Sequence, residues 1–179
     1  IPQEAGATAA GCYIEPKRRA FVVPYHVFRK NKTWFGIGID REMFRMLVAH
    51  EAAHAVAACN FRIPHPTIQA KEYLAYVAMF SAMSPELRAK ALRRTKTEGF
   101  ASFDRFTPLL YMFDPMRFGA EAYLHFSSAA DGTALIHDVP AGNVLVDQPI
   151  QMTPRTCPVL QAVLHDARRN RATAAASAP

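Results

Sequence analysis

Aromatic and β-branched residues are frequent over residues 12–38. Three stretches of this kind lie within residues 12–38, and the polar run Arg29–Lys32 separates the last two. Such stretches favour strands, and the polar run between them favours a turn. Pro24 interrupts the middle stretch, which predicts an edge position or a bulge there because proline cannot donate a hydrogen bond to a sheet. The pattern predicts a small antiparallel or mixed sheet near the N-terminus.

From Asp40 onwards the pattern becomes helical. Asp40 is a favoured N-cap residue, and the apolar stretch that follows it has no helix breaker up to Cys59. We therefore expect a helix over residues 41–59, with Asn60 in a left-handed conformation after its end. The stretch is apolar nearly all round, which predicts that the helix is buried.

Polar capping residues divide the rest of the chain into further helices. Thr67 is expected to cap a helix over residues 68–83. Ser84-Pro85 and Asp114-Pro115 each place a capping residue before a proline at the first helical position. Shorter helices are predicted over residues 103–113, 133–139 and 157–171. A sheet followed by helices is an α+β arrangement, with a mostly helical C-terminal part.

The composition suits one folded domain. Of the 179 residues, 50% are hydrophobic and 20% are charged, which excludes a disordered, collagen-like or coiled-coil chain. The chain has no run of about 18 uncharged apolar residues, so no membrane span is expected. We expect a loose arm over residues 1–11, a single domain over residues 12–171 and a disordered tail over residues 172–179.

The net charge and the cysteine content say little about the functional class of the protein. The net charge of +6 permits contact with nucleic acid or an anionic membrane. The basic segments over residues 88–96 and 168–171 lack the interleaved aromatic residues of a strand-stacking platform, so we expect solvated helix faces and no nucleic-acid partner. Cys12 and Cys157 would be able to pair in an oxidising compartment. The chain begins with Ile1, as after processing or trimming, and a secreted or periplasmic location is expected.

The segment His50-Glu51-Ala52-Ala53-His54 carries the chemistry. Residues four apart share one face of a helix, so His50 and His54 are placed to bind one Zn²⁺ ion. Glu51 is offset by one position, which suits a general base that reaches water without binding the metal. The segment lies in a helix predicted to be buried, where ionisable groups need partners and a metal would supply them.

A catalytic zinc ion usually has three protein ligands, so a third must lie elsewhere. Ala57 and Asn60 stand where the longer HExxHxxGxxH motif has glycine and histidine, which excludes that class. His65 lies in a loop between two prolines. Glu72 lies on the next predicted helix and is the only acidic residue between the motif and Glu86. Glu72 is the better candidate, because an antiparallel second helix would return it to the level of the histidines.

Together these residues resemble the gluzincin class of zinc metallopeptidases over about residues 33–83, as in a short bacterial member of that class. The resemblance implies that His50, His54 and Glu72 bind zinc and that Glu51 is the general base. It also implies a zincin-like fold, in which the strand Thr33–Ile39 lines the cleft and pairs with an extended peptide or protein substrate.

Peptide hydrolysis also needs a donor for the developing oxyanion. Tyr123 and His125, after Asp114-Pro115, are candidates, and Tyr111 is another. The expected function is a zinc-dependent hydrolase that cleaves peptide bonds. One alternative is a zincin-like binding module with weak or no activity, because Tyr76 stands where gluzincins often have an acidic residue that orients a histidine. Another is a metal-free, basic nucleic-acid-binding protein.

Overall fold

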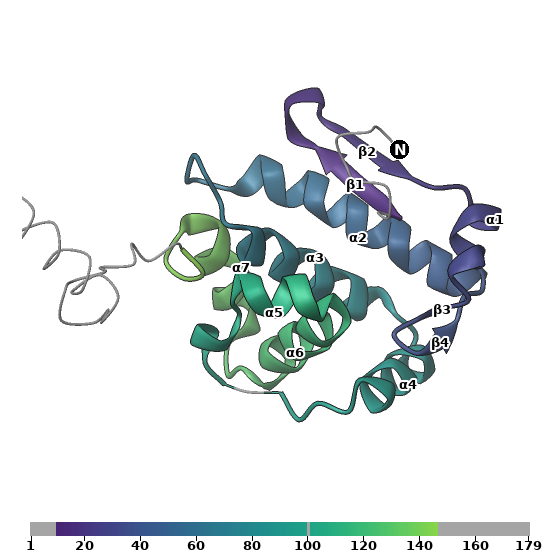
Figure 1. Ribbon diagram of the computed structural model, residues 1–179. Helices are drawn as coiled ribbons and strands as arrows, with labels where there is room; N and C mark the ends of the chain where they lie inside the picture. The colour runs from purple at the N-terminus through teal and green to yellow at the C-terminus, as the bar shows by residue number, and fades with distance from the viewer. Residues whose placement is uncertain (1–9, 100, 147–179) are drawn as a thin grey trace, which may run out of the picture. The chain divides into compact units, whose positions relative to one another are not determined.

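The computed structural model describes residues 10–99 and 101–146 of the chain (Figure 1). Within these ranges the protein is mostly helical, with two small antiparallel sheets near the N-terminus, which confirms the α+β prediction. Contacts divide the chain into a unit of residues 1–146 and a unit of residues 147–179, and every described residue lies in the first. The helix predicted over residues 157–171 and the tail over residues 172–179 lie outside the described residues.

Each sheet has two strands. β1 (Gly11–Ile14) pairs antiparallel with β2 (Arg19–Val22), and β3 (Thr33–Trp34) pairs antiparallel with β4 (Ile37–Gly38). Gly11, which was assigned to the predicted arm over residues 1–11, instead pairs with Val22 in β1, and residues 1–9 lie outside the described residues.

The middle strand prediction was too long. β2 ends at Val22, and residues Tyr25–Phe28 form the short helix α1 instead. Pro24 begins this turn, and its carbonyl accepts hydrogen bonds from the backbone N–H groups of Val27 and Phe28. The fixed φ of proline suits the start of a helical turn, and this preference outweighed the strand propensity of the residues after it.

In the described part of the chain, six longer helices follow the sheets: α2 (Arg41–Asn60), α3 (Ile68–Ala82), α4 (Pro85–Thr95), α5 (Pro108–Phe113), α6 (Pro115–Ser128) and α7 (Gly132–Ala141). The four predicted N-caps are confirmed, because each side chain accepts a hydrogen bond from a backbone N–H group in the first helical turn. These residues are Asp40, Thr67, Ser84 and Asp114.

Two helix ends differ from the prediction. Asn60 is still helical and its side-chain amide donates to the carbonyl of Val56, so α2 ends at an extended Phe61 rather than in a left-handed residue. The helix predicted over residues 103–113 is split into a 3-10 turn, Phe103–Arg105, and α5. The break falls where Thr107 caps α5 and Pro108 begins it.

α3 is the central helix of the core, with α2 and α6 packed against it (Figure 1). Tyr73, Met79 and Phe80 have no exposed surface. α2 is different, because Val48 is 42% exposed and Val56 is 64% exposed. The expectation that α2 is buried all round was therefore wrong, and the helix buries only the side that faces the rest of the unit. None of the helices in the described ranges has the length and apolar character of a membrane span.

Candidate metal centre

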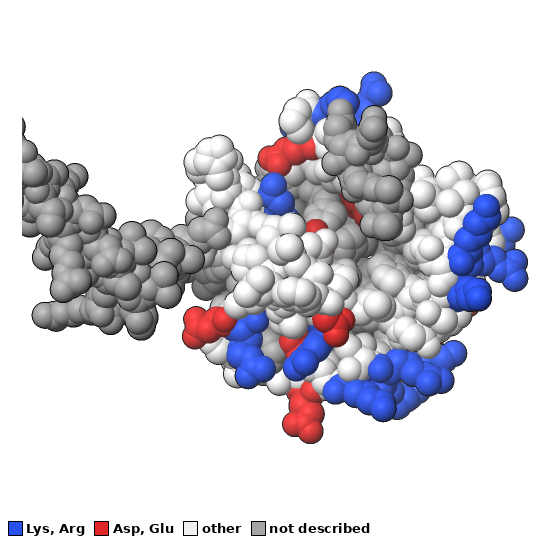
Figure 2. Space-filling model, viewed as in Figure 1, with Lys and Arg blue, Asp and Glu red and all other residues white. Residues whose placement is uncertain are grey.

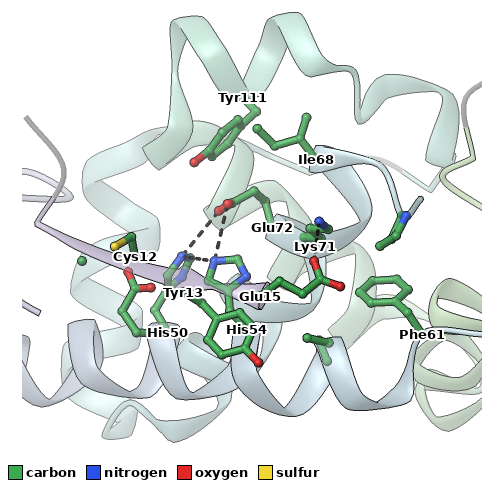
Figure 3. Close-up of a pocket in the computed structure, with 15 residues that line it drawn as sticks. Cys12, Tyr13, Glu15, His50, His54, Phe61, Ile68, Lys71, Glu72 and Tyr111 are labelled. Carbon is green, nitrogen blue, oxygen red and sulfur yellow. Dashed lines mark hydrogen bonds and ion pairs between the residues drawn. The ribbon is translucent and has the colours of Figure 1, made fainter. Parts of the chain in front are cut away.

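His50, His54 and Glu72 meet where α3 packs back along α2 (Figure 3). The Nε2 atoms of the two histidines are 3.1 Å apart. The Glu72 carboxylate faces both, with Oε2 3.4 Å from Nε2 of His50 and Oε1 3.4 Å from Nε2 of His54. Ligands about 2.0–2.1 Å from a tetrahedral zinc ion lie about 3.3 Å from one another. The three spacings are therefore close to those between the ligands of one tetrahedral zinc ion, and one ligand atom from each side chain would be able to reach the same ion.

The protonation states of these groups also suit a metal. Burial lowers the pKa of His54 to about 4, against the opposing effect of the Glu72 carboxylate. Burial alone would raise the pKa of Glu72, but the two histidines that face its carboxylate outweigh this effect and hold the pKa below its ordinary value. A neutral imidazole and a carboxylate are the forms that bind metal. Glu72 Oε2 is buried without a hydrogen-bond partner in the described ranges, as expected of an atom that awaits a ligand.

The support behind His50 is aromatic rather than acidic. The Tyr76 ring packs on the His50 ring, with centroids 4.5 Å apart. His50 Nδ1 is buried and has no hydrogen-bond partner among the residues that the structure describes. Metal-bound histidines usually donate this N–H group to a carboxylate or carbonyl oxygen, so the Nδ1 side of this ring is supported by packing instead.

Glu51 is buried next to the three groups, with 5% of its surface exposed. Gly11 of β1 lies directly against it, because a Cβ atom built at Gly11 would come within 2.6 Å of the Glu51 Cδ atom. Only glycine allows the backbone to come this close. Burial raises the pKa of Glu51 to about 7, although the charge of His50 lowers it in part. Its Oε2 atom has no hydrogen-bond partner within the described part of the chain.

A pocket of about 550 Å³ surrounds these groups. Its walls come from β1, α2, the start of α3 and Tyr111 of α5, and Figure 2 shows acidic atoms inside the hollow between the β1–β2 hairpin and α5. The strand that lines the pocket is β1 (Gly11–Ile14). The segment Thr33–Ile39 does not line it, because Phe35, Ile37 and Ile39 are buried in the hydrophobic core. The expectation that this segment forms the wall of the cleft was therefore wrong.

Tyr111 is the tyrosine that lines the pocket beside the candidate metal ligands. Its side chain points towards the Glu72 carboxylate in Figure 3. Burial, together with the negative charge of Glu72, raises the pKa of Tyr111 well above its ordinary value, so the hydroxyl keeps its proton. Of the three candidate donors, Tyr111 is the one that lines the pocket.

Tyr123 and His125 lie elsewhere, which corrects their assignment to the site. His125 is buried among aromatic rings, where Nδ1 accepts a hydrogen bond from the Tyr73 hydroxyl at 2.8 Å and Nε2 faces the Ala101 carbonyl at 3.2 Å. Burial lowers the pKa of His125, so it is a neutral structural residue. Tyr123 stacks on Phe80 with ring centroids 5.4 Å apart. Both therefore stabilise the core on the α6 side of α3.

Sequence reasoning missed the groups at the pocket mouth. Lys71 Nζ and Glu15 Oε2 form an ion pair 3.3 Å apart, which joins α3 to the turn after β1. Cys12 also lines the pocket, whereas Cys157, its proposed partner, lies outside the described residues. The one feature of the sequence that pointed to β1 was Gly11, because a glycine in a strand often marks a place where another group comes close to the backbone. His65 is exposed and does not line the pocket.

Comparison with known proteins gives a family without an assigned activity. No curated protein and no solved structure matches the chain. A sequence profile described as a family of unknown function, DUF6639, matches residues 1–149, which contain every residue of the candidate metal centre. The chain therefore belongs to the DUF6639 family.

Proposed function

We propose that this protein is a zinc-dependent hydrolase of zincin-like design that cleaves peptide bonds. The observation that carries the proposal is the triangle of side chains His50, His54 and Glu72. The two Nε2 atoms are 3.1 Å apart, and each lies 3.4 Å from a different oxygen of the Glu72 carboxylate. Two imidazoles and one carboxylate are a known ligand set for catalytic zinc, and this set leaves one coordination position open. All three side chains line the pocket, where a substrate would have room beside a bound ion.

The residues around the triangle divide the chemical work. A zinc ion held there supplies a Lewis acid that polarises the scissile carbonyl and acidifies water. Glu51 takes the proton of the attacking water on its unpartnered oxygen and returns it to the leaving amine, so the proton balance closes within one turnover. Tyr111 supplies a hydroxyl donor at the pocket wall, which suits the negative charge that develops on the carbonyl oxygen.

β1 supplies the substrate-binding edge in this proposal. It pairs with β2 along one edge, and its residues Gly11, Cys12 and Tyr13 line the pocket. An extended peptide is able to add to the other edge of such a strand through main-chain hydrogen bonds. The role first assigned to Thr33–Ile39 therefore passes to β1.

A zincin-like binding module with weak or no activity is the second candidate, and two observations favour it. Gly11 lies against Glu51 and restricts the approach of water to that carboxylate. His50 Nδ1 has no hydrogen-bond partner among the described residues, so the metal ligand lacks the polar support that tunes active zinc sites.

Metal analysis and peptide turnover test the proposal together. The protein is purified without chelator or added zinc, and its metal content is measured by inductively coupled plasma mass spectrometry. We expect about one zinc ion per chain, and hydrolysis of an internally quenched peptide library that stops with chelator and returns with zinc. Glu51→Gln is the matched control, because it keeps the three ligands and removes the base.

Two results would contradict the proposal. Protein without zinc at neutral pH, and without affinity for added zinc, would remove the metal centre. Protein that holds zinc but turns over none of the peptides would favour the binding module.

A further inference from the structure

α5 has one side that faces the pocket and the core and another side that faces solvent. Tyr111 points into the pocket, and Leu110 packs against the core. Leu109, Met112 and Phe113 point outwards and are 62%, 70% and 84% exposed. Their spacing of three and four residues places the three side chains on one side of the helix. We call these three residues the α5 apolar face.

This face is unusual for the surface of a folded domain. Single exposed apolar residues are common, but a cluster of large ones marks a surface that binds something. Phe113 has the highest exposed fraction among the large apolar residues that the structure describes. Methionine and phenylalanine together form an adaptable surface, because methionine is flexible and phenylalanine offers a large contact area.

The face is continuous with the pocket through its own helix. Tyr111 lies between the exposed residues in sequence, lines the pocket and points towards Glu72 (Figure 3). Ile68, 45% exposed, lines the same pocket and lies beside Tyr111 above Glu72 in Figure 3. A chain that leaves the pocket past Tyr111 therefore meets apolar side chains at its exit.

The charges near the face favour a polypeptide over a membrane surface. α5 itself carries no charged residue. The charged groups that flank it in sequence are balanced: Asp104 and Arg105 precede the helix, and Asp114 and Arg117 follow it. Binding to an anionic membrane would favour lysine and arginine around the face. In Figure 2 the uncharged surface over α5 is separate from the basic groups that gather along α4.

We propose that the α5 apolar face binds large apolar side chains of an extended polypeptide next to the segment that enters the pocket. The substrate class is therefore a polypeptide with exposed leucine- or phenylalanine-like residues, as in an unfolded chain. The inference rests on the proposed function for cleavage, but it concerns binding and is measured separately from turnover.

The test compares two ten-residue peptides. One carries leucine and phenylalanine near its centre, and the other carries serine at the same positions. Binding of each fluorescein-labelled peptide is measured by fluorescence anisotropy in a Glu51→Gln background, and turnover of quenched versions is measured with Glu51 intact. The test variant is Met112→Ser with Phe113→Ser, and Phe113→Ser alone is a milder second variant. Val27→Ser, at an exposed valine of α1, is the matched control.

We expect the double variant to bind the apolar peptide about tenfold more weakly and to lose about tenfold in its kcat/KM. The serine peptide should bind equally to the parent protein and the double variant. Val27→Ser should leave the affinity for both peptides unchanged. Thermal melts by circular dichroism verify that each variant folds, and the expected loss for Phe113→Ser is smaller but of the same sign.

Three results separate the possible failures. Equal affinity of the double variant and the parent protein for the apolar peptide overturns the inference, even where zinc-dependent turnover is present. Binding of the parent protein to phosphatidylcholine–phosphatidylglycerol vesicles, lost in the double variant while peptide binding is unchanged, also overturns it in favour of a membrane. If the parent protein binds the apolar peptide more tightly than the double variant does, but turns over neither peptide, the result supports the inference and contradicts the proposed hydrolase.

Discussion

Replacing Glu72 with glutamine tests the metal centre most directly. The substitution keeps the size of the side chain and removes the negative charge that faces the Nε2 atoms of His50 and His54 at 3.4 Å. The total binding free energy of a structural zinc ion is about 10–16 kcal/mol, so the loss of one charged ligand weakens binding by about 100-fold or more. His65→Ala is the matched control, because His65 is exposed and lies outside the pocket.

Thermal stability reports this loss without any substrate. Zinc at about 100 times its Kd stabilises the folded protein by about 2.7 kcal/mol. For a chain of this size, each kcal/mol raises Tm by about 2–4 °C, so zinc should raise the Tm of the parent protein by about 5–10 °C. At the same zinc concentration, a 100-fold weaker site gains only about 0.4 kcal/mol, which corresponds to about 1–2 °C.

The assay is a pair of thermal melts by differential scanning fluorimetry, with and without zinc, for the parent protein and both variants. We expect His65→Ala to keep the full zinc-induced rise in Tm and Glu72→Gln to lose nearly all of it. The reasoning is refuted if Glu72→Gln keeps the full rise while His65→Ala abolishes it, because the third ligand would then come from the loop.

Three further predictions concern the neighbours of the site. Glu51→Gln should keep zinc in metal analysis and lower kcat about 10²–10⁴-fold, because an amide cannot take a proton; loss of zinc would instead make Glu51 a ligand. Gly11→Ala should also keep zinc but lower kcat/KM, because the new methyl group would overlap the Glu51 carboxyl; unchanged kinetics would mean that β1 moves freely. Thr67→Val should lower the free energy of unfolding by about 1–3 kcal/mol in urea denaturation, because the backbone N–H of Ala70 and the carbonyl of Leu145 lose their partner; an unchanged midpoint would contradict this.

Local features of the chain were predictable because their causes are local. Asp40 and Thr67 were identified as N-caps because a short polar side chain reaches a backbone N–H group within three residues, whatever the rest of the chain does. The pairing of His50 with His54 follows in the same way from the helical repeat. Glu72 was identified as their partner because a short connection between two helices favours antiparallel packing, which brings it level with the motif.

Features that join distant parts of the chain were not predictable. Gly11 and Glu51 are forty positions apart, and Tyr111 is nearly forty positions beyond Glu72, so no repeat or spacing relates them. Tyr123 was as plausible a donor as Tyr111 in the linear chain, yet it stacks on Phe80 in the core.

The strand that lines the pocket was also not predictable from the sequence. Both β1 (Gly11–Ile14) and the segment Thr33–Ile39 have strand character, and the segment nearer the motif in sequence was the natural choice. In the structure Phe35, Ile37 and Ile39 are taken into the core, which leaves β1 beside Glu51. Periodicity and capping of single segments determined the helices and two of the three candidate metal ligands. The lining of the pocket depends on which apolar side chains the whole unit buries. The free energy gained by burying them comes from contacts among many residues that are distant in sequence.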